Sequence, residues 1–172
     1  MRTLVTGAPG SGKTSLVVFA SKQRNTRFVD ADSLPGLCEW VEKATSKVLG
    51  LVTEYKETGE DAWYATYDWY WRVDFLKQFL RDNPEVILCG SADNIFECYQ
   101  LFDRIFILRK TEAELLANLS SPNRANPFGK TPEQRKNFMN FQGQLIREAQ
   151  QYEPILLDGN DIAHSYNAIV KS

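Results

Sequence analysis

The sequence predicts an α/β fold in three layers, in which a parallel β-sheet carries helices on both faces. Two observations support this prediction. Short apolar runs of strand length alternate along the chain with stretches whose apolar residues recur at helical spacing, and this alternation is typical of βαβ units. The first run is followed by a glycine-rich loop, residues 7–14, that leads into the first helical stretch. Such folds bind ligands at the carboxyl ends of their strands, where this loop lies.

The composition indicates one compact soluble domain over residues 1–172. The chain is 43% hydrophobic, and its 20 basic and 22 acidic residues give a formal net charge of -2 without any block of one sign. This balance argues against nucleic acid as a partner and against a membrane surface. A glycine loop that begins at residue 7 leaves no room for a secretory signal, and no apolar run approaches the length of a membrane span. We therefore expect a cytoplasmic protein.

Cysteine and histidine are too few or too scattered to build a metal centre. Cys38, Cys89 and Cys98 have no metal-like spacing, so we expect reduced thiols in or near the core. His164 is the only histidine and lies in a polar stretch near the C-terminus. We expect it on the surface or at a helix start, which disfavours histidine-based catalysis and sites with several histidines.

The first elements follow from local patterns. Thr3–Thr6 is a β-branched apolar run that predicts a strand, and residues 15–22 carry apolar side chains at helical spacing. Residues 27–32 predict a second short strand that ends in two carboxylates, and residues 33–36 form the turn that follows.

Residues 37–82 are expected to form a long helical region, broken near Gly50 and again near residues 58–61, which would act as a substrate-binding insert of about residues 36–82. Its second part is crowded with aromatic side chains. Helical spacing would place five of them on one buried face, namely Tyr64, Tyr67, Trp71, Phe75 and Phe79. Three others fall off that face and are free to line a pocket or pack against a mobile segment: Trp63, Trp69 and Tyr70.

The second half of the chain continues the alternation. Residues 85–90 form a continuous apolar run that predicts a buried, central strand. Further strands are expected at 104–108 and 155–157, and helices at 91–101, 112–119, 132–151 and 161–170. Thr111 and Glu114 form a capping box, Pro132 opens a helix, and Asp161 caps the last one.

The loop Gly-Ala-Pro-Gly-Ser-Gly-Lys-Thr fits the Walker A pattern G-x-x-x-x-G-K-[ST] without a mismatch. In this P-loop the backbone N–H groups would surround phosphate oxygens, Lys13 would reach the β and γ phosphates, and the Thr14 hydroxyl would ligate Mg²⁺. The alternative is a glycine turn without a ligand. We expect a nucleoside triphosphate, with ATP as the default, to be bound by Gly7, Ala8, Pro9, Gly10, Ser11, Gly12, Lys13, Thr14 and Ser15.

Asp30 and Asp32 are candidates for the metal and for the chemistry. In an extended strand end, residues two apart point the same way, so both carboxylates would face the cleft that holds the P-loop. We assign Asp30 to Mg²⁺ or its water shell, and Asp32 to the hydroxyl of a phosphate acceptor, as the group that takes its proton or hydrogen-bonds to it. Alternatively, Asp32 only starts the turn.

The loop at about residues 120–131 resembles a lid, because it is rich in helix breakers and holds Arg124 and Lys130. Closure would bring Arg124, as a catalytic residue, and Lys130 over the phosphates, where they would neutralise developing charge and exclude water. The alternative is a solvated surface loop.

Other nucleotide enzymes are disfavoured by what the sequence lacks. It has no Asn-Lys-x-Asp guanine signature and no Leu-Ser-Gly-Gly-Gln, and no strand ends in Asp-Glu. The strand at 85–90 is followed by Ser91 rather than by an acid. A motor that activates water there is therefore disfavoured, whereas a kinase whose metal partner comes from the second strand is not.

Taken together, the chain resembles the small P-loop kinases of the shikimate kinase and adenylate kinase group. It has the P-loop, the Asp30-Ala31-Asp32 strand end, a glycine after the third strand and the Arg124 lid in the expected order. Residues 69–76, 89–94 and 126–133 look more closely like motifs of a family in that group that is described as ATP-binding. The resemblance implies a five-stranded sheet of order 2-3-1-4-5, a substrate region between strands two and three, and transfer of the ATP γ-phosphate.

The chain also departs from these relatives. Shikimate kinases have a glycine run after strand three, where this chain has residues 91–94, Ser-Ala-Asp-Asn, which argues against shikimate as the acceptor. Adenylate kinases have an arginine that stacks on adenine just before the lid, where this chain has Ala117 and Asn118. The base preference therefore stays open.

The sequence thus predicts an ATP-dependent kinase of a small molecule, with nucleosides and nucleotides among the candidate acceptors. The predicted acceptor pocket consists of Asp32, Trp40, Trp69, Trp71, Arg72 and Asn94. Core packing is the alternative for Trp40 and Trp71, and a solvated helix face is the alternative for Arg72. A nucleotide-binding switch that hydrolyses ATP slowly and signals to a macromolecular partner remains the second hypothesis, and a kinase directed at RNA or protein is the third. The aromatic surplus fits a dimer face as well as a pocket.

Overall fold

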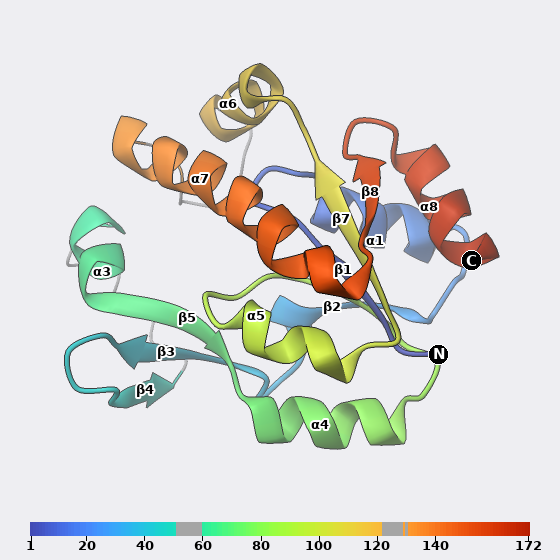
Figure 1. Ribbon diagram of the computed structural model, residues 1–172, viewed down its shortest axis with the longest axis horizontal. Coiled ribbons are helices and arrows are strands. Elements are labelled where there is room, and N and C mark those ends of the chain that lie inside the picture. The colour runs from blue at the N-terminus through green and yellow to red at the C-terminus, as the bar shows by residue number, and fades with distance from the viewer. Residues whose placement is uncertain (51–59, 122–128, 130) are drawn as a thin grey trace.

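A five-stranded parallel sheet forms the centre of the protein (Figure 1). The structure is a computed structural model that describes residues 1–50, 60–121, 129 and 131–172. The order β2-β6-β1-β7-β8, counted among these five strands, is 2-3-1-4-5, and each neighbouring pair is parallel. The predicted class and order are therefore confirmed. The strands are β1 (Thr3–Thr6), β2 (Phe28–Asp30), β6 (Ile87–Cys89), β7 (Arg104–Arg109) and β8 (Ile155–Asp158).

Helices cover both faces of the sheet, because side chains along the central strands alternate between two separate cores. Leu4 belongs to the core beneath α4, α5 and α7, and its neighbour Val5 belongs to the core beneath α1 and α8. Figure 1 shows α4 and α5 on one side of the strands and α1 and α8 on the other. The helices are α1 (Lys13–Lys22), α4 (Val73–Asp82), α5 (Ile95–Cys98), α6 (Glu112–Ser120), α7 (Pro132–Ala149) and α8 (Ile162–Lys171).

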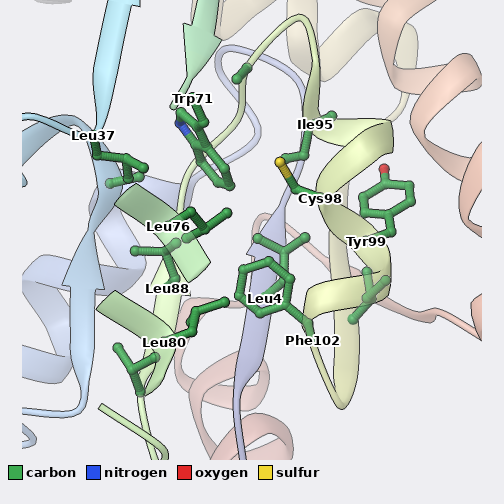
Figure 2. Packing of buried hydrophobic residues seen from close by; sticks show 14 of the residues in the cluster. Leu4, Leu37, Trp71, Leu76, Leu80, Leu88, Ile95, Cys98, Tyr99 and Phe102 are labelled. Carbon is green, nitrogen blue, oxygen red and sulfur yellow. The ribbon is translucent and has the colours of Figure 1, made fainter. Parts of the chain in front are cut away.

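The larger core joins the sheet to the segment between β2 and β6 (Figure 2). Leu4, Leu76 and Leu88 are fully buried in it, and Trp71 is 1% exposed. Burial of a leucine side chain contributes roughly 1.5–3 kcal/mol to folding. This core therefore fixes the segment that carries Trp71 against the main sheet.

The segment between β2 and β6 contains a second sheet, so the prediction of a long helical region was wrong for the strands of that sheet. β3 (Cys38–Glu42), β4 (Val48–Gly50) and β5 (Tyr67–Trp71) form an antiparallel sheet of order β4-β3-β5. Together with α3 (Glu60–Thr66) and α4, it makes up the described part of the insert.

The aromatic residues explain this error. Aromatic side chains favour strands when they can pack against a cross-strand partner. Trp40 on β3 lies opposite Trp69 on β5, and their ring centroids are 4.8 Å apart. The five-residue helical face predicted from Tyr64 to Phe79 therefore does not exist, because Tyr67–Trp71 is a strand and α4 begins only after Arg72.

Smaller differences concern element ends. The second strand stops at Asp30, and the chain turns into a 3-10 helix, η1 (Ala31–Ser33). The helix expected at 91–101 is α5 followed by η2 (Tyr99–Leu101), and α7 ends at Ala149 before η3 (Gln150–Tyr152). The predicted caps are present: Thr111 and Glu114 form the capping box, and Asp161 accepts from the His164 N–H group.

The three cysteines are buried free thiols, as predicted, and His164 is an exposed residue in the first turn of α8. Within the described ranges, none of the helices combines the length and apolar character needed to cross a lipid bilayer.

Candidate active site

The P-loop connects β1 to α1 and curls around its own backbone. Gly12 has φ 110° and precedes the first residue of α1, Lys13. A side chain is strained at that angle, and a Cβ on Gly12 would also lie 2.8 Å from the carbonyl oxygen of Gly159. Glycine at this position therefore allows the loop between β8 and α8 to pack against the P-loop.

Lys13 lies over the loop that precedes it. Its Nζ donates to the carbonyl oxygens of Gly7 at 2.5 Å and of Ala8 at 3.1 Å. Neither it nor the next two residues is acidic, so the positive end of the α1 dipole is not neutralised within the first turn. Helix α6 holds the other side of the loop, because Asn118 donates from Nδ2 to the Gly10 carbonyl oxygen at 2.9 Å.

Asp30 and Asp32 lie close to Lys13, although not in the geometry expected from an extended strand end. Asp30 ends β2, and its Oδ1 accepts from the Asp32 N–H group at 3.1 Å as the chain enters η1. The premise that both residues continue a strand was therefore wrong. The two carboxylates nevertheless remain within electrostatic reach of each other and of Lys13.

Desolvation raises the pKa of Asp32 above its ordinary value, although part of the residue is exposed to solvent. The negative charge of Asp30 raises it further, while Lys13 and a hydrogen bond from the Trp69 side chain act in the opposite direction. The Cys38 thiol also donates weakly to Asp32 Oδ1 at 3.9 Å. Asp32 is thus an exposed residue whose carboxylate is oriented by contacts with Cys38 of β3 and Trp69 of β5.

A cavity of about 340 Å³ adjoins the P-loop. Four parts of the chain form its wall: the P-loop, the insert, the segment after β6, and α7 from Gln134 to Gln144. The lining residues are Pro9, Lys43, Tyr64, Asp68, Trp69, Ser91, Ala92, Asp93, Gln134, Asn137, Phe138, Asn140, Phe141 and Gln144.

Hydrogen bonds and an ion pair hold the charged groups of the cavity wall in place. Lys43 pairs with Asp68 at 3.3 Å and donates to the Tyr64 carbonyl oxygen at 2.6 Å. Asp93 Oδ2 accepts from the Trp69 N–H group at 2.7 Å, and the Asp93 N–H group donates to the Trp69 carbonyl oxygen at 2.7 Å. Desolvation is the main cause that raises the pKa of Asp93 to about 6, although part of the residue is exposed to solvent.

Only some of the residues predicted for an acceptor pocket lie at this cavity. Trp69 lines it, whereas Asp32 is not among its lining residues and accepts a hydrogen bond from the Trp69 side chain. Trp40 is 5% exposed and packs behind Trp69 rather than on the cavity wall.

The other three predicted residues lie away from the cavity wall. Trp71 is buried in the larger core. Asn94 is buried too, and its side chain pairs with both backbone groups of Trp71, accepting from N–H and donating to C=O at 2.9 Å each. Arg72 is exposed, donates to the Gly36 carbonyl oxygen and lies 3.6 Å from Glu39. Arg124 and Lys130, predicted for the lid, lie outside the described residues.

Sequence reasoning missed the contribution of α7. Its residues Gln134, Asn137, Phe138, Phe141 and Gln144 recur three or four positions apart and share one helix face, which reaches the cavity. This regular spacing of amide and aromatic side chains could have predicted a ligand-facing side of the helix from the sequence alone. Asp68 and Asp93 carried no comparable signal, because only the fold brings β5, which holds Asp68, next to the loop after β6, which holds Asp93.

Comparison with known proteins identifies the fold. No family model matches the sequence, and no curated protein does. Among solved structures, a shikimate kinase from Acinetobacter baumannii in complex with shikimate matches with a TM-score of 0.58 at 12% identity, over 99% of this chain and 93% of that one.

Two further structures are similar. A deoxyadenosine kinase from M. mycoides with bound dATP has a TM-score of 0.56 at 13% identity, over 99% of this chain and 98% of that one. A shikimate kinase from Bacteroides thetaiotaomicron has a TM-score of 0.51 at 17% identity, over 99% and 97%. The chain therefore has the fold of the small P-loop kinases over nearly its whole length.

Proposed function

We propose that this protein is an ATP-dependent kinase that transfers the γ-phosphate to a small molecule. The observation that carries the proposal is the position of the P-loop, which shares one end of the sheet with two carboxylates and with a 340 Å³ cavity. Phosphoryl transfer needs an anion site, a group that handles the acceptor hydroxyl, and a space for the acceptor. All three requirements have candidate residues here.

The P-loop fits a phosphate group in three respects. The backbone turns through Gly12 into the N-terminus of α1, where N–H groups point outward without an intrahelical partner. Lys13 adds a cation whose Nζ donates to the carbonyl oxygens of Gly7 and Ala8, the first two residues of the loop. The Ser11 Oγ atom is buried and has no hydrogen-bond partner in the structure, and a phosphate oxygen would supply one.

Thr14 and Asp30 are the proposed residues for Mg²⁺. When bound, this ion supplies positive charge to the transferring phosphate group. Among the described residues no three His, Cys, Asp or Glu side chains cluster as a metal site. A Mg²⁺ ion in such kinases is commonly held by only one or two protein groups, with phosphate oxygens and water completing its shell, so a hydroxyl and one carboxylate suffice.

Asp32 is proposed to bind the acceptor hydroxyl and to take its proton. Its raised pKa favours this role, because a base works best when its pKa approaches the operating pH. The hydrogen bond from the Trp69 side chain would hold the carboxylate in one orientation. Arg124 and Lys130 remain our proposed lid residues, and three buried free thiols agree with a reducing, cytoplasmic setting.

The test is ATP consumption and phosphate transfer by the purified protein with Mg²⁺, across nucleosides, nucleotides, sugars and hydroxy acids. Lys13→Ala should abolish transfer and retain the folded structure, whereas Lys22→Ala, at the exposed far end of the same helix, should match the wild type. Turnover near the wild-type rate in Lys13→Ala would refute the catalytic assignment. Slow hydrolysis that no acceptor accelerates would favour a nucleotide switch instead.

A further inference from the structure

We propose that the cavity beside the P-loop is the acceptor site and that it selects ring-bearing molecules without an anionic group, with Asp93 and Asp68 excluding anions. This inference rests on the proposed function, because it names the class of acceptor that the kinase would use. It is argued from the rings, the charges and the amides that line the cavity.

Aromatic side chains face the cavity from two sides. Tyr64 and Trp69 come from the insert, and Phe138 and Phe141 come from α7. The Tyr64 and Phe138 rings approach edge to face with centroids 6.3 Å apart, so the two sides meet at this pair. Trp69 is supported from behind by Trp40. Rigid flat walls of this kind bind planar rings better than flexible chains.

The charged groups on the wall disfavour an anion. Among the described residues that line the cavity, two are acidic and one is basic. The basic residue, Lys43, already has Asp68 at 3.3 Å and the Tyr64 carbonyl oxygen at 2.6 Å, so a bound anion would compete with both. Asp93 is held at the cavity by two hydrogen bonds with the backbone of Trp69. A carboxylate or phosphate on the ligand would therefore meet like charge, which costs binding free energy.

The other polar side chains in the described part of the cavity wall are neutral. Gln134, Asn137, Asn140 and Gln144 bring amide groups to the cavity from α7, and an amide can both donate and accept. Gln134 Oε1 accepts from the Gly129 N–H group at 2.6 Å, which fixes that end of the stripe. Amides and carboxylates together suit hydroxyl, amino or ring N–H groups on the ligand.

Three probes that share the indole ring system and differ in charge test the inference directly: tryptophol is neutral, tryptamine is cationic and indole-3-acetate is anionic. Their binding is measured by calorimetry without ATP. We expect the wild type to bind tryptophol and tryptamine at least about tenfold more tightly than indole-3-acetate, as like-charge exclusion requires. Equal or tighter binding of the anion, or binding of none of the three, would overturn the proposal.

Asp93→Asn is the decisive variant, because the amide keeps an acceptor for the Trp69 N–H group and removes the charge. The preference against indole-3-acetate should fall to about twofold or less. Asp74→Asn makes the same chemical change on the exposed surface of α4 and should leave the preference unchanged. If Asp93→Asn does not fold, Asp68→Asn, which frees Lys43 to attract an anion, should weaken the preference in the same way. An unchanged preference in the folded variant would contradict our assignment.

The two proposals fail separately. A kinase that proves active on an anionic acceptor would refute the charge selection and leave the kinase assignment intact. Charge-selective binding of the probes, lost in Asp93→Asn, together with no phosphate transfer to any acceptor, would support the cavity assignment and refute the kinase.

Discussion

Asn94 shows how one side chain joins the insert to the main sheet. Its amide satisfies both backbone groups of Trp71 at the end of β5, where the indole enters the larger core. The same residue looked like a ligand-binding residue in the sequence, because a polar side chain just after a central strand often faces the cleft. Only the position of β5 reveals that the amide is used for structure.

Replacement of Asn94 by alanine should therefore destabilise the protein. Two buried backbone groups would lose their partners, at a cost of about 2–4 kcal/mol in the free energy of unfolding. Urea denaturation measures this difference. Asn83→Ala, which removes a hydrogen bond on the exposed surface, should cost much less, and equal losses in the two variants would contradict the role of Asn94.

Asp93 should lower the stability of the folded protein at neutral pH. Its pKa is raised to about 6, mainly by desolvation, so the folded state resists ionisation that the unfolded chain allows from about pH 4 upward. Asp93→Asn should then be more stable than the wild type at pH 8, and the gain should shrink between pH 6 and pH 4. Thermal unfolding across this pH range tests the sign.

Asp103 provides the opposite case on the same fold. Its pKa is lowered, chiefly by hydrogen bonding to Arg2 at the start of the chain. It therefore contributes stability above its unfolded pKa and loses it as the pH falls. Asp103→Asn should be less stable than the wild type at neutral pH, and a difference of the same sign in both variants would refute this assignment.

At the scale of elements, Gly90 sets how closely the insert approaches the main sheet. A Cβ there would lie 2.4 Å from the Ala31 Cβ and 2.8 Å from Trp71 Cζ2, so β6, η1 and β5 meet at a point with no room for a methyl group. The position of Asp32 in η1 depends on the same contact.

Gly90→Ala should therefore reduce stability by about 1–3 kcal/mol and also weaken turnover, since η1 carries Asp32. Gly143→Ala is the matched change in α7, where a Cβ would meet only the far end of the Arg147 side chain, at 3.3 Å. It should stabilise the helix by up to about 1 kcal/mol. Calorimetric melting of both variants distinguishes close packing from a general effect of alanine.

The contrast between the P-loop and the insert explains how far the sequence could predict this structure. The P-loop and the buried strands are local patterns, and the strands lie close to their predicted positions. The geometry expected for Asp30 and Asp32 was wrong, because the chain leaves β2 after Asp30 and turns into η1. The strand β5 was missed because a run of aromatic residues is compatible with a helix or a strand. Trp69 lies in a strand because it pairs with Trp40, which is distant in the sequence. The wall of the cavity was missed for the same reason, since four separated segments build it.

For the whole molecule, we propose that the fold carries two separable binding regions. ATP would occupy the P-loop between α1, α6 and the loop after β8, while the acceptor would occupy the cavity between the insert and α7. A single P-loop carries the first region, and the second depends on the insert sheet. Each can therefore be damaged without loss of the other.

Ligand-induced stabilisation should reveal this independence. ATP with Mg²⁺ at 100 times its Kd should stabilise the wild type by about 2.7 kcal/mol, because only the folded state binds it. Lys13→Ala should lose most of this gain and still bind tryptophol. Asp93→Asn should keep the full gain from ATP, because its carboxylate faces the cavity and not the phosphates. Thermal shift measurements with each ligand would show whether each variant loses the effect of one ligand and keeps that of the other. Loss of the ATP effect in Asp93→Asn would mean that one connected site, rather than two, spans this end of the sheet.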